Sequence, residues 1–249
     1  MMSSRIKFIK PSIFESEVID SWFTLRNHYL IQTDNDIPGL NLGLNTAEKE
    51  SIVLKNRKLL AQEIDTNEEL IAFGRQIHKT DIKYVIEGGT YQKTDGFVTD
   101  TPGLALAIQV ADCAAILLAD EKNKVIGAAH AGWRGAVANI VPKVIDKMVQ
   151  LGAEEQHIKA YISPCISQVN FEVGEEVASE FPKEFVDRKK YKKPHVDLKG
   201  FIRHQIIQSG MLGSNIELDE SCTIEGEQFY SYRRQGQKSG RMMGIIKLK

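Results

Sequence analysis

The middle of the chain constrains the fold most strongly, because four short, apolar segments rich in β-branched residues follow one another there. They are Asp95–Thr99, Leu104–Val110, Ala114–Ala119 and Val125–Ala129. Segments of this length and composition are typical of β-strands, and the EKNK string between the last two predicts a hairpin turn. Several of the connections are too short for a helical crossover between parallel strands. We therefore expect an α/β protein with a mixed sheet and flanking helices.

The remaining sequence alternates between strand-like and helical patterns. Amphipathic spacing predicts helices over residues 48–64, 137–151, 171–181 and 199–209. Further strands are expected over residues 5–10, 22–33, 70–77, 82–86, 158–162, 228–232 and 242–248. Since no repeat, low-complexity segment or Pro/Ser-rich linker interrupts the chain, we expect a single domain over residues 1–249.

Composition argues against several classes of partner. Lys and Arg number 32 against 33 Asp and Glu, a net charge of −1, so no basic excess indicates binding to nucleic acid or to an anionic membrane. No apolar run reaches the roughly 18 residues of a membrane span, and the charged N-terminus is unlike a signal peptide. Three cysteines, an odd number, do not form a disulfide framework. These features favour a cytoplasmic protein; the oligomeric state stays open, and a monomer is compatible with them.

Three good metal ligands stand where apolar segments end: His78 in RQIH, Cys113 in VADC and His130 in AAHAGWRG. Two imidazoles and a thiolate are a ligand set that zinc takes when its fourth position stays open for water or substrate. The ligands lie 35 and 17 residues apart, which is unlike the close pairs of a zinc finger or the HExxH helix. They must therefore converge from separate strand ends. The alternative is that Cys113 is a small buried hydrophobe.

The residues beside these ligands also suit a site. Ala129, Ala131 and Gly132 surround His130, and small residues let another group approach the backbone closely. Asp112 precedes Cys113 and is a candidate hydrogen-bond partner for an imidazole, or a proton acceptor. The alternative role for Asp112 is a strand-end residue that binds local amides.

Longer strings around the ligands resemble one bacterial family along nearly the whole chain. The strings are QIH, GLALAIQVADCAAILLAD and IGAAHAGWRG, together with NLGLN from Asn41, NR at Asn56 and Arg57, and the tail FYSYRRQGQKSGR. They are similar to the laccase-domain family, which is named after multicopper polyphenol oxidases. Its members are described as purine nucleoside phosphorylases with adenosine deaminase activity.

The resemblance implies a zinc ion bound by His78, Cys113 and His130, with Cu²⁺ as an ion that the same ligands can take in vitro. It implies a four-layer α/β/β/α fold with mixed sheets, shared with certain cysteine hydrolases. Its partners would be purine nucleosides and phosphate, with no nucleic acid and no membrane. The chain departs from the family pattern in a few positions, which puts pocket shape and substrate preference in question. These positions are Asn45, Lys79 and Ser163.

The implied reactions are the deamination of adenosine to inosine and the phosphorolysis of adenosine, inosine and S-methyl-5′-thioadenosine. We expect His78, Cys113, His130 and Asp112 to be catalytic, with Asp112 moving protons. Phosphorolysis also needs cationic or amide donors for phosphate. The candidate arginines are Arg75, Arg134, Arg233, Arg234 and Arg241. Among all residues, Asn41, Arg75 and Arg241 are those we expect to bind substrate.

Three other interpretations use the same residues. Cys113 can act as a thiolate nucleophile activated by His130 or His78, which gives an amide hydrolase. Relatives credited with the editing of peptidoglycan precursors fit that activity. Copper-dependent oxidation of phenols needs several copper ions and many histidine ligands, and only two of six histidines are suitably placed. A binding module stabilised by structural zinc would normally supply four protein ligands.

Overall fold

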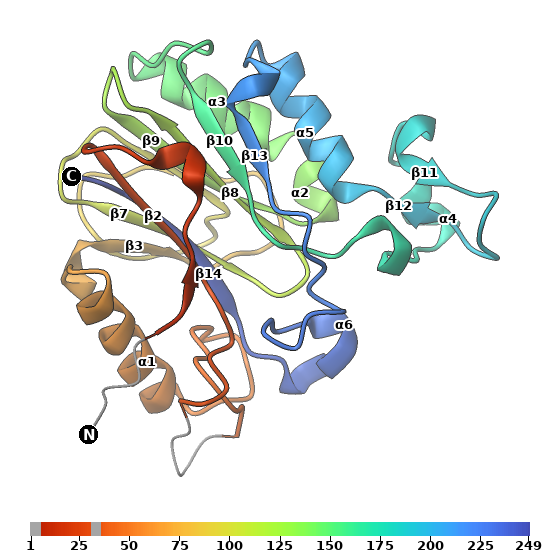
Figure 1. Cartoon of the computed structure of the whole chain (residues 1–249), viewed down its shortest axis with the longest axis horizontal. Helices are drawn as coiled ribbons and strands as arrows, with labels where there is room; N and C mark the ends of the chain where they lie inside the picture. The colour runs from red at the N-terminus through yellow and green to blue at the C-terminus, as the bar shows by residue number, and fades with distance from the viewer. Residues whose placement is uncertain (1–5, 31–35) are drawn as a thin grey trace.

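Two six-stranded β-sheets pack face to face in the computed structural model of this chain, which describes residues 6–30 and 36–249 (Figure 1). The first sheet contains, in spatial order, β1 (Phe8–Ile9), β2 (Ile19–Thr24), β14 (Met242–Leu248), β7 (Ala105–Val110), β3 (Ile71–Gly74) and β5 (Gly89–Tyr91). The second contains β13 (Ile216–Leu218), β10 (Lys159–Ile162), β8 (Ala114–Asp120), β9 (Val125–Ala131), β6 (Gly96–Thr99) and β4 (Ile82–Tyr84). Both sheets are mixed, since β3 runs parallel to β5 and β7, and β4 and β13 run parallel to their neighbours.

Helices cover the outer faces of the two sheets. The helix α1 (Glu50–Glu63) packs on the first sheet, and α2 (Trp133–Val137), α3 (Ile140–Gln150) and α5 (Leu198–Gln208) pack on the second (Figure 1). The short helices α4 (Glu175–Ala178) and α6 (Tyr232–Gln235) and the strands β11 (Val186–Asp187) and β12 (His195–Val196) lie outside these layers. One-turn 3-10 helices occur at Ser12–Phe14, Glu68–Leu70, Gln168–Asn170, Lys183–Phe185, Gly213–Asn215 and Gly236–Lys238.

Strand alternation divides the apolar core into three layers. In β7, Leu106 faces the space between the sheets, whereas Ala107 faces the layer that α1 closes. In β8, Leu117 points between the sheets and Leu118 points to the layer under α3 and α5. Because successive side chains of a strand point to opposite faces, each sheet is buried on both sides. The four-layer α/β/β/α arrangement with mixed sheets is therefore confirmed.

Most of the predicted elements are present. The predicted segment 242–248 is β14 in full, and α1, α5, β7, β8, β9 and β10 lie within one or two residues of their predicted positions. The EKNK string forms the turn between the antiparallel strands β8 and β9. The predicted strands 70–77 and 82–86 are shorter, as β3 and β4. The helix predicted over 137–151 begins at Ile140, because Asn139 adopts a left-handed backbone with φ of 60°.

Three predicted elements differ from the structure. The helix predicted over 171–181 is reduced to α4, because Gly174 is extended and Phe171 and Phe181 are buried from irregular backbone. The strand predicted over 228–232 is wrong: Phe229 and Tyr230 are buried, but they lie in irregular backbone that pairs with no strand. The predicted strand 22–33 ends early, at the end of β2, and of the predicted segment 5–10 only β1 is a strand. Positions 5 and 31–33 of these predictions lie outside the described residues.

Among the helices of the described ranges, none combines the length and the apolar character that a membrane crossing requires.

Candidate metal centre and its cavity

His78, Cys113 and His130 come together at one end of the two sheets. One ligand atom from each residue lies within 4.8 Å of the others, and the two imidazole ring centroids are 4.8 Å apart. His130 is in β9, Cys113 lies between β7 and β8, and His78 lies in the loop after β3. The three residues thus converge from separate strand ends, the arrangement that the spacing of the sequence requires. In the part of the chain that the structure describes, this is the group that can hold a metal ion.

Asp95, the residue before β6, contacts both histidines. Its Oδ1 lies 2.9 Å from His130 Nδ1 and also accepts a hydrogen bond from the backbone N–H of His78. Its Oδ2 accepts from the backbone N–H groups of Ile77 and Lys79. These bonds fix a loop in which His78 has a positive φ of 60°, a conformation that is rare outside glycine. The Asp95 contact leaves His130 Nε2 as the ring nitrogen free for a metal.

Asp95 was not predicted from the sequence, where Asp112 was the candidate for the imidazole contact, with binding of local amides as its alternative role. In the structure Asp112 has no such contact: its Oδ1 accepts from the Thr223 hydroxyl at 2.7 Å, and its Oδ2 accepts from the Arg233 backbone N–H at 2.7 Å. Asp112 thereby ties the β7–β8 turn to the C-terminal segment. The only local signal for Asp95 is a carboxylate at the start of a strand, which does not identify its partners.

The residues of the cluster shift one another's pKa values. Burial raises the pKa of the Cys113 thiol, but the charges and hydrogen bonds of His130 and His78 outweigh it and lower that pKa to about 6. Burial lowers the pKa of His130, yet the Cys113 thiolate and Asp95 together raise it to about 9. The site therefore stabilises a thiolate at neutral pH. Thiolate and imidazole are the forms in which Cys and His bind metals, and a bound cation would replace the imidazolium proton.

Gly132 makes room for the thiolate. A Cβ at this position would lie 2.7 Å from Cys113 Sγ, closer than real Cβ contacts. The backbone of Gly132 is extended, with φ of −79°, so the requirement comes from space and not from conformation. Soft and borderline donors, their spacing and the cleared space all fit a zinc ion with three protein ligands.

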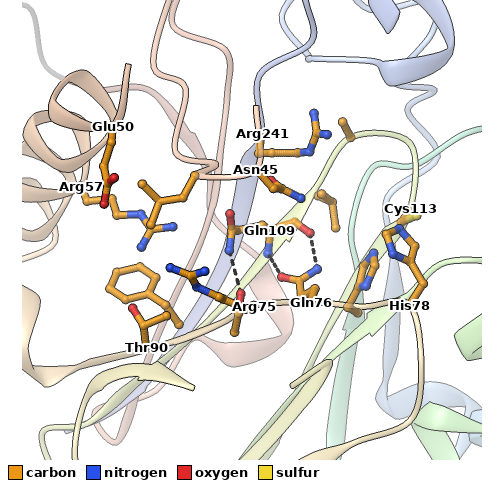
Figure 2. Close-up of a pocket in the computed structure, with 16 residues that line it drawn as sticks. Asn45, Glu50, Arg57, Arg75, Gln76, His78, Thr90, Gln109, Cys113 and Arg241 are labelled. Carbon is orange, nitrogen blue, oxygen red and sulfur yellow. Dashed lines mark hydrogen bonds between the residues drawn. The ribbon is translucent and has the colours of Figure 1, made fainter. Parts of the chain in front are cut away.

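The cluster forms one end of a cavity of about 390 Å³, which is large enough for a small-molecule ligand (Figure 2). We call His78, Cys113 and His130 its ligand end. Arg57 and Arg75 lie at the opposite side and form what we call its arginine end (Figure 2). Between the two ends, the side chain of Gln76 exchanges two hydrogen bonds of 2.8 Å with the backbone of Gln109. Asn45 and Arg241 line a further wall.

Of the residues expected to bind substrate, Arg75 and Arg241 line the cavity and Asn41 does not. Asn41 is fully buried. Its Oδ1 accepts hydrogen bonds from the backbone N–H groups of Gly43 and Arg241, and its Nδ2 donates to Thr46. Asn41 thus supports the cavity wall from behind. The side chain of Arg241 is partly engaged as well, because its Nη1 donates to the carbonyls of Ser239 and Gly240.

The other candidate arginines lie away from the cavity lining. Arg134 stacks on Trp133, with 4.2 Å between its Cζ and the ring centroid. Arg233 donates to the Glu172 carbonyl, and Arg234 binds four backbone carbonyls of the C-terminal segment. Arg57, named above only as part of the NR string and given no role there, lines the cavity instead. Its position on the buried face of α1 does not indicate from the sequence that its guanidinium group faces the cavity.

Comparisons with known proteins find relatives along most of the chain. The family model described as multi-copper polyphenol oxidoreductase laccase matches residues 21–249. A purine nucleoside phosphorylase of Deinococcus radiodurans is 36% identical over 213 residues, 84% of this chain and 82% of the relative. Adenosine deaminase RL5, from an unknown prokaryotic organism, is 29% identical over 90% of this chain and 92% of its own. The crystal structure of Bacillus licheniformis protein YfiH superposes with a TM-score of 0.86 at 28% identity, over 93% of each chain.

Proposed function

The chain belongs to the multi-copper polyphenol oxidoreductase laccase family, and from this membership we propose that it is a zinc-dependent enzyme of purine nucleosides. Relatives named purine nucleoside phosphorylase and adenosine deaminase support a nucleoside-processing function. We propose two reactions. One is phosphorolysis of adenosine, inosine and S-methyl-5′-thioadenosine to the base and (methylthio)ribose 1-phosphate. The other is deamination of adenosine to inosine. The observation that carries the proposal is the cluster of three ligand atoms at the end of a ligand-sized cavity.

His78, Cys113 and His130 are the residues proposed to hold the zinc ion. Bound there, the ion would supply Lewis-acid polarisation of groups that enter the cavity. The chain contributes the orientation of its ligands: Asp95 fixes the ring of His130 and the loop of His78, as outer carboxylates do at histidine metal sites. In the deamination, a water oxygen forms a bond to C6 of the purine, the bond from C6 to the amino nitrogen breaks, and ammonia leaves.

Proton transfer needs a carboxylate whose oxygens keep lone pairs that no hydrogen bond uses. Two carboxylates lie near the cluster, Asp95 and Asp112. Asp95 is fully buried and accepts from four donors, which uses its lone pairs. Asp112 is half-buried and accepts from Thr223 and from the Arg233 backbone only. We therefore assign proton exchange with the substrate to Asp112 and positioning to Asp95.

Substrate contacts are proposed for the groups between the two ends of the cavity. The Gln76–Gln109 pair presents amide groups at its centre, and Arg75 and Arg241 supply cationic donors (Figure 2). Asn41 acts indirectly, by holding the backbone of Arg241.

Chromatography of the products tests the proposed reactions. The purified protein is incubated with adenosine and phosphate: inosine reports deamination, and adenine with ribose 1-phosphate reports phosphorolysis. Zinc content is measured in the same preparation and in Cys113→Ala, with Cys222→Ala as the matched control, because Cys222 is outside the cluster. We expect both products, and zinc lost from Cys113→Ala alone. Neither product from adenosine, or full zinc retained by Cys113→Ala, contradicts the proposal.

A second candidate function rests on the polarised thiol. In this alternative, Cys113, with its pKa lowered to about 6, would be the thiolate nucleophile, His130 its imidazolium partner and Asp95 the carboxylate that orients His130. We propose as the alternative an amide hydrolase that acts on peptidoglycan precursors. Release of an amino acid from a muramyl-peptide precursor by the metal-free protein, without turnover of adenosine, would favour it.

A further inference from the structure

The arginine end of the cavity holds two guanidinium groups that face each other. Arg57 comes from α1 and Arg75 follows β3, and their head groups point into the same space (Figure 2). Within the described ranges, neither forms an ion pair with a carboxylate within 4.0 Å. Two like charges in one cavity repel each other, and an anion between them would remove that repulsion.

Arg57 is a buried charge that pairs with no carboxylate of the described residues. It is 2% exposed, its Nε donates to the Leu42 carbonyl at 3.0 Å, and its Cζ lies 4.2 Å from the ring centroid of Phe73. Because Nε is used, both terminal nitrogens are left for the cavity. Burial lowers the pKa of Arg57 to about 10, so the group stays charged at neutral pH. A buried cation is costly unless a partner satisfies it, which indicates an anionic ligand.

Arg75 completes the pair from the opposite wall. Its backbone N–H binds the Tyr91 carbonyl and anchors the residue at the end of β3. Its side chain is exposed to the cavity and has no hydrogen bond to another described residue. Planar guanidinium groups bind phosphate and carboxylate oxygens in pairs of parallel hydrogen bonds. A tetrahedral oxyanion can accept such a pair from each arginine.

We propose that Arg57 and Arg75 form the site for inorganic phosphate, a subsite that rests on the proposed phosphorolysis. A nucleoside that spans the Gln76–Gln109 pair would direct its purine to the ligand end and its ribose to the arginine end. A phosphate oxygen then forms a bond to C1′ as the bond from C1′ to N9 breaks. The electron pair of that bond leaves with the purine, which takes up a proton from water. The same orientation presents C6 of the purine for deamination.

Glu50 allows a substitution at the same end of the cavity with the opposite expected effect on phosphate binding. It is an exposed carboxylate at the arginine end and is drawn beside Arg57, but it makes no ion pair with it (Figure 2). Its charge opposes a bound phosphate. Glu50→Gln should therefore tighten phosphate binding, whereas loss of a guanidinium should weaken it.

Calorimetric titration with inorganic phosphate tests the subsite without turnover. We expect Arg75→Gln to weaken phosphate binding by roughly tenfold or more, since charge-assisted hydrogen bonds are lost. Arg203→Gln removes the same charge from the exposed face of α5 and should leave the affinity unchanged. Arg57→Lys keeps the buried charge but loses the paired donors, and it should weaken binding in the same direction. Equal affinity of Arg75→Gln, Arg203→Gln and the parent protein overturns the assignment.

Kinetics separate this inference from the proposed function. With adenosine and limiting phosphate, Arg75→Gln should lower the ratio of phosphorolysis to deamination by roughly tenfold. If phosphorolysis occurs and the ratio does not change, the subsite is wrong and the proposed function stands. If phosphate binds in an Arg75-dependent manner but no nucleoside is cleaved, the proposed phosphorolysis fails and the anion site stands.

Discussion

Asp95 Oδ1 lies 2.9 Å from His130 Nδ1, and both side chains are buried, at 0% and 3% exposure. The same oxygen accepts the backbone N–H of His78. One carboxylate therefore sets the ring of one ligand and the backbone of another. The third ligand, Cys113, owes its low pKa to both histidines. The arrangement of all three ligands therefore depends on Asp95.

Replacement of this carboxylate should loosen the metal centre. Asp95→Asn keeps the size of the side chain but supplies one acceptor oxygen for four donors, so the loop of His78 loses support. Changes in the outer partner of a histidine ligand typically cost about 10- to 100-fold in metal affinity, and we expect a loss in that range. Competition with a chelating dye measures it. Asp100→Asn, an exposed residue of the same region, is the control. Equal zinc affinity in both variants would contradict the role.

Gly132→Ala should damage the site with little effect on the fold. The added Cβ would meet Cys113 Sγ at 2.7 Å, and the Cys113 side chain, which is not fully buried, can move away from it. We expect a stability cost at the low end of the about 1–3 kcal/mol typical of overpacking, together with a clear loss of zinc affinity. Thermal unfolding and dye competition report the two effects. The comparison is Gly213→Ala, where the nearest atom to a new Cβ is 3.7 Å away. Full zinc affinity of Gly132→Ala would show that the space is not needed.

Asp112→Asn should slow deamination and retain zinc. General acid–base groups contribute about 10²- to 10⁴-fold in rate, so a loss of kcat in this range is expected. Asp112 also ties the β7–β8 turn to the C-terminal segment, and Thr223→Val removes one of these ties while the carboxylate remains. If Asp112 only supports the turn, the two variants should lose activity and stability alike. A loss of kcat in Asp112→Asn that Thr223→Val does not share would assign proton transfer to Asp112.

Local sequence pattern predicted a mixed sheet with flanking helices, whereas the four layers were implied by the family resemblance. The pattern was insufficient where burial does not follow a period. Leu106 and Ala107 alternate between two apolar layers, and that period of two is visible in the sequence. Phe229 and Tyr230 show the opposite case. They are adjacent and both buried, and the Tyr230 hydroxyl donates to the Pro38 carbonyl 192 residues away. A strand was predicted there because local apolar character does not distinguish an anchored loop from a strand.

The same distinction holds for the site. His78, Cys113 and His130 each follow or end a strand-like run, so their convergence could be inferred from spacing. Asp95 is 17 residues from His78 and 35 from His130, and its hydrogen bonds exist only after β6 pairs with β9. Arg57 sits among the apolar residues of α1, where an arginine normally reaches toward solvent. Its contact with the cavity depends on the packing of α1 over the end of β3.

Acid should remove a stabilising contribution from Asp120, which is fully buried at the end of β8. Burial raises the pKa of its carboxyl, but hydrogen bonds from Asn123 and from the Glu154 backbone N–H outweigh burial and lower that pKa. A carboxyl with a depressed folded-state pKa stabilises the fold above its unfolded pKa of about 3.9, and this contribution is lost as the pH falls through the folded value. Asp120→Asn should therefore be less stable than the parent near neutral pH, and the gap should shrink below about pH 4. Urea unfolding at several pH values in this range measures the difference in unfolding free energy between Asp120→Asn and the parent. Asp146→Asn, at an exposed position, is the control. A gap that stays constant with pH would mean that packing, and not the charge, accounts for the contribution of Asp120.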